Sequence, residues 1–389
     1  MLWVALRCPE DCVMRVIVLA LLMFSAVGLS LLQVTLAGDP FSGFAVLGET
    51  VNAGLPALYT LAAVFLLLGF LVGIPDFARN RSFLYGIRAE VLRHDLRLVV
   101  AFNFAIILVS QYFMGSAGVL GIMSGTVTAQ DIEAALDASP FGVHGVKLLC
   151  GYLSIIMHRA AHPLKDARGL KAVLVLQALF IFLSSAKMGG MLFFVASLLT
   201  LEQGKNMATL LKGVVAALVL MAIFVITRLI RNPDMQIADV GAFLMTFVLG
   251  LYFGSPVVNT NYVMNHPEAG GKIIFLISHL VPQKLLPSTL KDAMVSFPDP
   301  TSPLGLIGAT YAAYSFVGVA FGCMFAGFLV ARLAPGHDKN PVKDLFLPFL
   351  LVASGFAIMY HHFFNLNFFW MPLLMAWAVS TRYFCKWKS

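Results

Sequence analysis

Lys187 is a lone cation inside a long apolar stretch of this chain, and its position suggests a role in binding. The segment around it reads Ile181-Phe-Leu-Ser-Ser-Ala-Lys-Met-Gly-Gly190. As one helix, residues 170–202 would be about 50 Å long, well above the hydrocarbon thickness of a bilayer, which is about 30 Å. We therefore expect a turn at Lys187, at the external end of two short spans, where a charge costs least and can meet a ligand.

Two arginines follow the apolar run 213–227, two spans after Lys187, and the same topology places Arg228 and Arg231 on the face of Lys187. Several cations on one face suit a phosphorylated or acidic ligand, because Arg offers a fork of hydrogen-bond donors and Lys a point charge. The simpler explanation is that each cation anchors the chain at lipid headgroups. That explanation suffices for any one of them and is weaker for all three together.

Aromatic and amide side chains form a second group on this predicted face. The group comprises Tyr252, Asn259, Asn261, Tyr262 and His266, with His361 and His362 nearer the carboxyl end. Rings and amides together suit a sugar-binding cleft, and His266 and His362 are the best candidates for a proton acceptor. A single His or Tyr at a membrane interface, in contrast, is usually an amphipathic anchor.

Metal-binding and cofactor-binding patterns are missing from the sequence. The predicted external segments contain no Asp-x-Asp, His-x-x-x-His or cysteine pair, and the chain has no phosphate-binding Gly loop. We therefore expect neither a metal ion nor another cofactor. The five cysteines are an odd number and predict no disulfide framework.

The composition identifies the elements that must hold these residues. Hydrophobic residues make up 60% of the chain and charged residues 12%, which leaves too little polar surface for a soluble domain. The net charge of +7 is concentrated in short loops, where it sets membrane orientation rather than nucleic-acid binding. We predict an all-α polytopic integral membrane protein.

Basic and non-basic loops alternate and so orient the chain. Residues 37–53 and 117–143 contain no Lys or Arg, whereas residues 76–97 and 159–171 carry several. By the positive-inside rule the first two loops are external and both termini are cytoplasmic. The expected spans lie near 13–36, 54–75, 98–116, 144–158, 171–186, 188–201, 213–227, 304–332, 345–360 and 367–381.

Both ends of the region between residues 237 and 303 are predicted to be external. We expect a re-entrant segment over 237–257 and one long periplasmic loop over 258–303, for a total of about 10–11 transmembrane helices. One alternative changes this topology. If residues 170–202 formed one long tilted helix, Arg228 and Arg231 would become cytoplasmic anchors.

The whole chain is expected to be a single membrane domain over residues 1–389. Its parts are the amino-terminal spans (1–170), the region of the hairpin, re-entrant segment and long loop that would form the active site (171–303), and the carboxyl-terminal spans (304–389).

Several short features occur in order along the second half of the chain. They are Ser184-Ser-Ala-Lys187, Arg228 or Arg231, Leu251-Tyr-Phe-Gly254, the loop 258–303, and Pro298-Asp-Pro-Thr301 leading to Tyr314-Ser-Phe-Val-Gly318. Together they resemble the oligosaccharide repeat-unit polymerases, or Wzy-type O-antigen polymerases, over residues 170–380. Lys187 stands where that family usually has Arg, which keeps the charge but loses the bidentate fork.

The resemblance implies a metal-independent glycosyltransferase of the bacterial inner membrane that acts at the periplasmic face. It would join repeat units of O-antigen, part of lipopolysaccharide, or of a related surface polysaccharide, moving the glycan from undecaprenyl pyrophosphate onto the next lipid-linked unit. We expect the catalytic residues to be Lys187, Arg228, Arg231, His266 and His362. The expected substrate-binding residues are Tyr252, Asn259, Asn261, Tyr262, Thr301 and His361. Expected partners are the undecaprenyl-pyrophosphate-linked glycans, membrane lipids and a chain-length regulator, with no nucleic acid.

Three other functions share parts of this pattern. A lipid-linked oligosaccharide flippase or other transporter would also place cations in a membrane cavity, although carriers usually show internal repeats, which we do not find here. An O-antigen ligase has a similar architecture and leaving group but uses the lipid A core as acceptor. A membrane acyltransferase is suggested only by His361 and His362.

Overall fold

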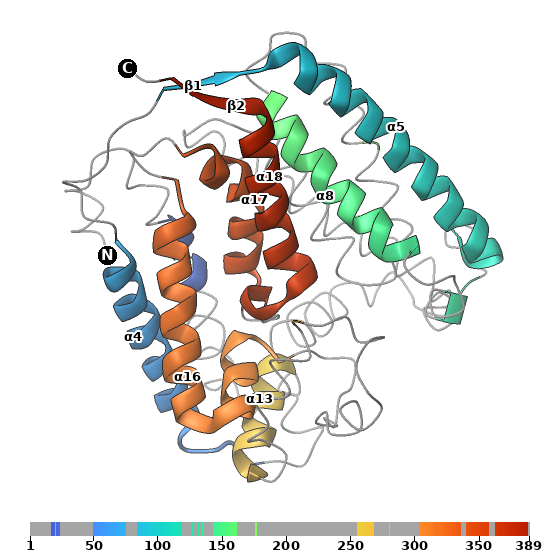
Figure 1. Cartoon of the computed structure of the whole chain (residues 1–389). Helices are drawn as coiled ribbons and strands as arrows, with labels where there is room; N and C mark the ends of the chain where they lie inside the picture. The colour runs from blue at the N-terminus through green and yellow to red at the C-terminus, as the bar shows by residue number, and fades with distance from the viewer. Residues whose placement is uncertain are drawn as a thin grey trace, which may run out of the picture. The chain divides into compact units, whose positions relative to one another are not determined.

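The structure is a computed structural model of the whole chain, and several separate stretches of it can be described. These stretches are residues 50–74, 84–118, 143–161, 255–267, 304–335, 340–357 and 362–387, with short pieces at 17–19 and 21–23 and the single positions 121, 127, 131, 134, 135, 176 and 280. Figure 1 draws the described helices and strands.

Within these stretches, three helices are long and apolar enough to cross a membrane. They are α4 (Leu55–Gly73), α5 (Ala89–Met114) together with the short 3-10 helix η3 (Gly115–Ala117), and α16 (Leu306–Leu333). This agrees with the coarse expectation of a helical membrane protein. The full number of spans stays a prediction.

The chain divides into two compact units. The first contains residues 1–82 and 241–371, and the second contains residues 83–240 and 372–389. Each unit is therefore assembled from segments that are far apart in the sequence.

In the first unit, α4 and α16 pack closely because glycines line their contact. A Cβ atom on Gly69 would overlap the backbone of Met324, and one on Gly327 would overlap the carbonyl oxygen of Leu66. With no side chain between them the two backbones can approach closely, as small residues allow in membrane helices.

α16 is not the single continuous span that the sequence predicts over 304–332. Tyr314 and Ser315 have non-helical backbone angles, and a Cβ atom on Gly318 or Gly322 would overlap Thr310. In a straight helix those glycines would lie about 12 and 18 Å further along the axis than Thr310. The chain therefore reverses at Tyr314–Ser315, and the helix after the break, residues 316–333, is about 27 Å long.

A shorter helix, α13 (Ser255–Asn265), packs against the part of α16 that precedes the break. Val263 of α13 shares a buried cluster with Leu304, Ala309 and Ala312. The sequence predicts one long external loop over residues 258–303, and the structure shows that its first part is helical up to Asn265. Val and Asn are poor helix formers, so packing rather than propensity stabilises α13.

The first unit also contains α17 (Pro341–Gly355), the 3-10 helix η8 (His362–Phe364) and the π-helix η9 (Leu366–Trp370). The Asn340 side chain caps α17 by accepting a hydrogen bond from the Val342 N–H at 3.0 Å. Phe346 and Phe363 both pack on the buried Phe369 ring, each with a centroid distance of 5.1 Å. These rings form the core beneath η8 and η9.

In the second unit, α5 lies beside α8 (Val143–Ala161) (Figure 1). The buried positions of α5 are Leu92, Leu96, Asn103, Ile107, Ser110 and Met114. Their spacing of mostly three and four residues forms one seam along the helix. The helix begins at Ala89, nine residues before the expected apolar span. Its first turns are charged, so an apolar pattern does not reveal them.

Two short strands in the second unit depart from a purely helical fold. β1 (Leu84–Ile87) pairs antiparallel with β2 (Phe384–Trp387), which directly follows α18 (Met371–Tyr383). The Arg88 N–H extends this pairing by donating to the Tyr383 carbonyl at 3.0 Å. The sequence predicts both strand segments to be cytoplasmic, and the ladder joins them.

Candidate functional site

Four of the predicted site residues lie in the described part of the chain with their side chains. Asn259, Asn261 and Tyr262 are on α13, and His266 follows its last residue. The backbone of His362 begins η8. Lys187, Arg228, Arg231, Tyr252, Thr301, His361 and the His362 side chain lie outside the described residues, so the cation group stays a prediction.

The end of α13 is held by a hydrogen-bonded group that we call the asparagine cluster: Asn52, Asn261, Asn265 and the carbonyl of Thr50. Asn261 Oδ1 accepts from the Asn52 N–H at 2.7 Å, and Asn52 Nδ2 donates to Asn265 Oδ1 at 2.9 Å. The Nδ2 groups of Asn261 and Asn265 both donate to the Thr50 carbonyl, at 3.0 and 2.9 Å. Because Asn261 and Asn265 are four residues apart on a helix, they present their amides on one side.

The asparagine cluster also fixes the entry into α4. Asn52 Oδ1 accepts from the Gly54 N–H at 2.9 Å, which is the local turn that Asn favours. α4 then begins at Leu55, with Pro56 in its first turn. Sequence reasoning missed Asn52, although the Asn-Ala-Gly run before an apolar helix is a signal for a turn.

Tyr262 and His266 form a pair of rings next to the asparagine cluster. Their centroids are 4.3 Å apart and their planes are tilted by 30°. Both residues are half-buried. The pair offers an aromatic surface with an imidazole at its edge, which could contact a sugar and accept a proton.

Asn259 and Asn261 are fully buried, unlike the ring pair. Asn261 uses both ends of its amide in protein contacts. The structure therefore gives Asn261 a positioning role, and direct contact of either residue with a substrate stays a prediction.

Buried contacts beneath α13 set its position against α4 and α16. The Thr260 hydroxyl donates to the Pro256 carbonyl at 2.6 Å, and the side chains of Tyr59 and Thr260 are hydrogen-bonded. A Cβ atom on Gly308 would overlap the Thr260 hydroxyl. Glycine at 308 thus lets α16 approach α13 at the level of Thr260.

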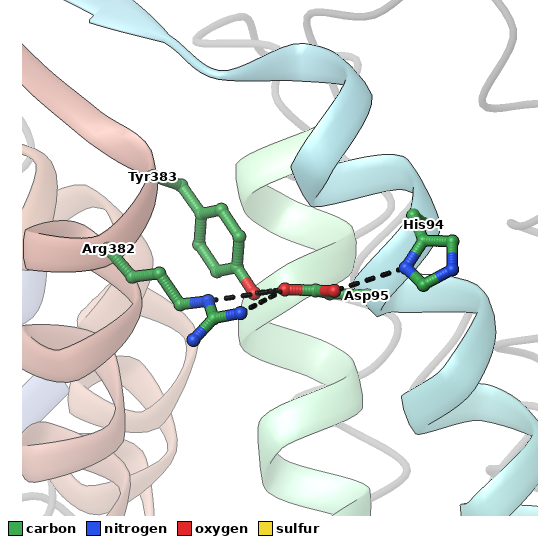
Figure 2. Close-up of polar contacts among 4 residues, drawn as sticks. All are labelled: His94, Asp95, Arg382 and Tyr383. Carbon is green, nitrogen blue, oxygen red and sulfur yellow. Dashed lines mark hydrogen bonds and ion pairs between the residues drawn. The ribbon is translucent and has the colours of Figure 1, made fainter.

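A second polar group, which we call the Asp95 clamp, lies in the second unit (Figure 2). Asp95 Oδ2 accepts from the Tyr383 hydroxyl at 2.7 Å and from Arg382 Nη2 and Nε at 2.8 and 3.2 Å. The other oxygen, Oδ1, lies 3.3 Å from His94 Nδ1. One carboxylate therefore ties the charged start of α5 to the end of α18.

Hydrogen bonds within the Asp95 clamp also shift the pKa values of Asp95 and Tyr383. The Tyr383 hydrogen bond, assisted by His94 and Arg382, lowers the pKa of Asp95, while burial together with the Asp95 charge raises the pKa of Tyr383 to about 12. With its oxygens engaged in this way, Asp95 is suited to holding two segments together rather than to proton transfer.

Within the described residues, no three His, Cys, Asp or Glu side chains gather where a metal ion could bind. Comparison with known proteins adds no assignment: no family model matches the chain, no curated protein matches its sequence, and no solved structure matches its fold.

Proposed function

We propose that this protein is a membrane glycosyltransferase that polymerises lipid-linked oligosaccharide repeat units at the periplasmic face. The ordered motifs of residues 170–380 and the apolar helices support the proposal. The observation that carries it is the Tyr262–His266 ring pair, which the asparagine cluster holds at the end of α13. The sequence predicts Lys187 and Arg228 on that same face.

The proposed reaction needs few groups from the protein. The acceptor hydroxyl oxygen attacks the anomeric carbon of the donor, and the bond from that carbon to the pyrophosphate oxygen breaks. His266 or His362 takes the hydroxyl proton, and the pyrophosphate leaves with its charge balanced by Lys187, Arg228 and Arg231. Sugar rings would pack against Tyr262.

A lipopolysaccharide gel of a strain lacking the gene tests the proposed function. Loss of the ladder with a single repeat unit retained is the expected result for a polymerase. Loss of every repeat unit would instead indicate a ligase or a flippase. In the complemented strain, full activity of both His266→Ala and His362→Ala would remove the histidines from the mechanism.

One observation favours a transporter as the second candidate. α16 is interrupted at Tyr314 and Ser315, and discontinuous helices form the substrate sites of many carriers. A strain without its flippase would receive no repeat unit in the periplasm, so the same gel separates the two functions.

A further inference from the structure

The reversal at Tyr314–Ser315 is an unusual backbone for an apolar segment. Ser315 has φ 55° and ψ −146°, and it is the one residue other than glycine with a positive φ in the described part of the chain. Glycine adopts this conformation without steric cost, whereas serine does not. Serine at this position therefore carries backbone strain that glycine would avoid.

Close packing fixes the reversal in place. Gly318 and Gly322 lie against Thr310, whose hydroxyl donates to the carbonyls of Leu306 and Ile307 at 2.9 and 3.0 Å. Any side chain larger than hydrogen at either glycine would push the two parts of α16 apart. The turn is therefore held by its surroundings rather than by its own residues.

The break also leaves backbone groups that need partners. The first N–H groups of the helix 316–333 and the last carbonyls of 306–313 have no partner within their own helices. Such groups need protein, water or a ligand as partners. Tyr314 is 61% exposed, so the protein does not cover its ring, which is open to contact with a ligand.

Packing links the turn to α13. Tyr311 stacks edge-on against Phe316 across it, with ring centroids 5.4 Å apart. Tyr311 also packs on the buried cluster that joins α16 to Val263 of α13. α13 is the helix that carries Tyr262, and His266 follows its end.

We propose that the Tyr314–Ser315 turn binds a sugar of the lipid-linked substrate, with the Tyr314 ring against the sugar face and the Ser315 hydroxyl bonded to a sugar hydroxyl. The inference rests on the proposed polymerase function and adds two residues to its substrate site. An exposed ring and a hydroxyl held in a fixed turn are groups that suit a neutral, hydroxylated ligand.

Variants of the turn in the complemented deletion strain test this inference. Tyr314→Ala should reduce long chains about tenfold or more, the loss expected for one large contact, whereas Tyr314→Phe keeps the ring and should retain most chains. Ser315→Gly should reduce long chains roughly 2- to 13-fold, the value of one hydrogen bond. The purified Ser315→Gly protein should melt at the same or a higher temperature, because glycine relieves the backbone strain.

Tyr112, which is 82% exposed on α5, provides the control, and Tyr112→Ala should give a normal ladder.

Two results would overturn the inference. The first is a normal ladder in both Tyr314→Ala and Ser315→Gly. The second is a ladder that is lost in Tyr314→Ala only together with protein level and melting temperature, and is kept in Ser315→Gly; the turn would then serve the fold alone. Failure of the proposed function looks different, because the deletion strain itself would then keep its ladder or lose every repeat unit, including the single one.

Discussion

At the scale of single residues, Lys187 is the sharpest test of the predicted cation group. Removing one partner of a charged hydrogen bond to a buried anion costs about 2 to 5 kcal/mol, or roughly 30-fold to several thousandfold. Lys187→Ala should therefore abolish long chains without lowering the protein level, as read from a ladder gel and an immunoblot. Lys187→Arg should retain activity, because it restores the donor fork typical of the resembled family.

Headgroup anchoring is the competing explanation for these cations. Headgroup anchoring is the better explanation if the Lys187→Ala, Arg228→Ala and Arg231→Ala proteins all make normal ladders. An anchoring residue can be replaced singly at little cost, whereas a pyrophosphate at a membrane edge needs more than one cation.

The Asp95 clamp predicts a stability effect with a definite pH dependence. The Asp95 carboxyl is 20% exposed, so losing the Tyr383 hydrogen bond in Tyr383→Phe should cost about 1 kcal/mol at neutral pH. Arg382→Ala should cost less, because Arg382 is 64% exposed and its charge is screened by water. Thermal unfolding of the detergent-purified proteins measures both differences.

The sign of the pH effect follows from the lowered pKa of Asp95. Its ionised form stabilises the fold, so the contribution is complete above the ordinary carboxyl pKa of about 4 and is lost as pH falls through the lower folded-state value. Wild type and Tyr383→Phe should therefore converge in stability at strongly acidic pH. In an Asp95→Asn background, Tyr383→Phe should lose this pH dependence, and a persistent one would place its origin elsewhere.

At the scale of elements, the contact between α4 and α16 depends on the absence of side chains. Gly327→Ala places a methyl group on the Leu66 carbonyl, and overpacking of this kind costs about 1 to 3 kcal/mol. We expect a lower melting temperature for the purified variant. A Cβ atom on Gly355 of α17 would meet nothing within 4 Å, so Gly355→Ala is the matched control and should leave the melting temperature unchanged or raise it. Equal effects of the two substitutions would contradict a packing role for Gly327.

Periodicity and length predict some of these elements well and others poorly. The span expected near 54–75 is α4, with Pro56 and the turn at Asn52 marking its start. The break in α16 could not be predicted, because Tyr314-Ser-Phe contains neither Gly nor Pro at the turn itself. It depends on Gly318 and Gly322 meeting Thr310, a contact that no local pattern reveals.

The candidate site is likewise only partly predictable from the sequence. Tyr262 and His266 could be selected from residue type and predicted side. Their four-residue spacing brings the two rings together because α13 is a helix, whereas the sequence predicts only an external loop there. Asn52 precedes Asn261 by 209 residues, and no local pattern in the sequence connects the two.

At the scale of the whole molecule, the orientation in the membrane follows from charge in the loops and stays a prediction. The structure adds one constraint, since the asparagine cluster requires residues 50–54 and the end of α13 to lie on the same side. The sequence places both segments outside. It places the start of α5 and the carboxyl-terminal strand inside, where the Asp95 clamp and the β1–β2 ladder join them.

Single cysteines in a background without the five native cysteines test this orientation. Ala53 and Pro267 are exposed on either side of the asparagine cluster, and cysteines there should react in whole cells with a maleimide that cannot cross the inner membrane. Cysteines at positions 187 and 228 should react as well, because the turn at Lys187 keeps both outside. A cysteine at the exposed Arg88 should react only after the inner membrane is permeabilised. If position 228 were blocked while 267 was labelled, residues 170–202 would form one long helix, and Arg228 and Arg231 could no longer hold a periplasmic pyrophosphate.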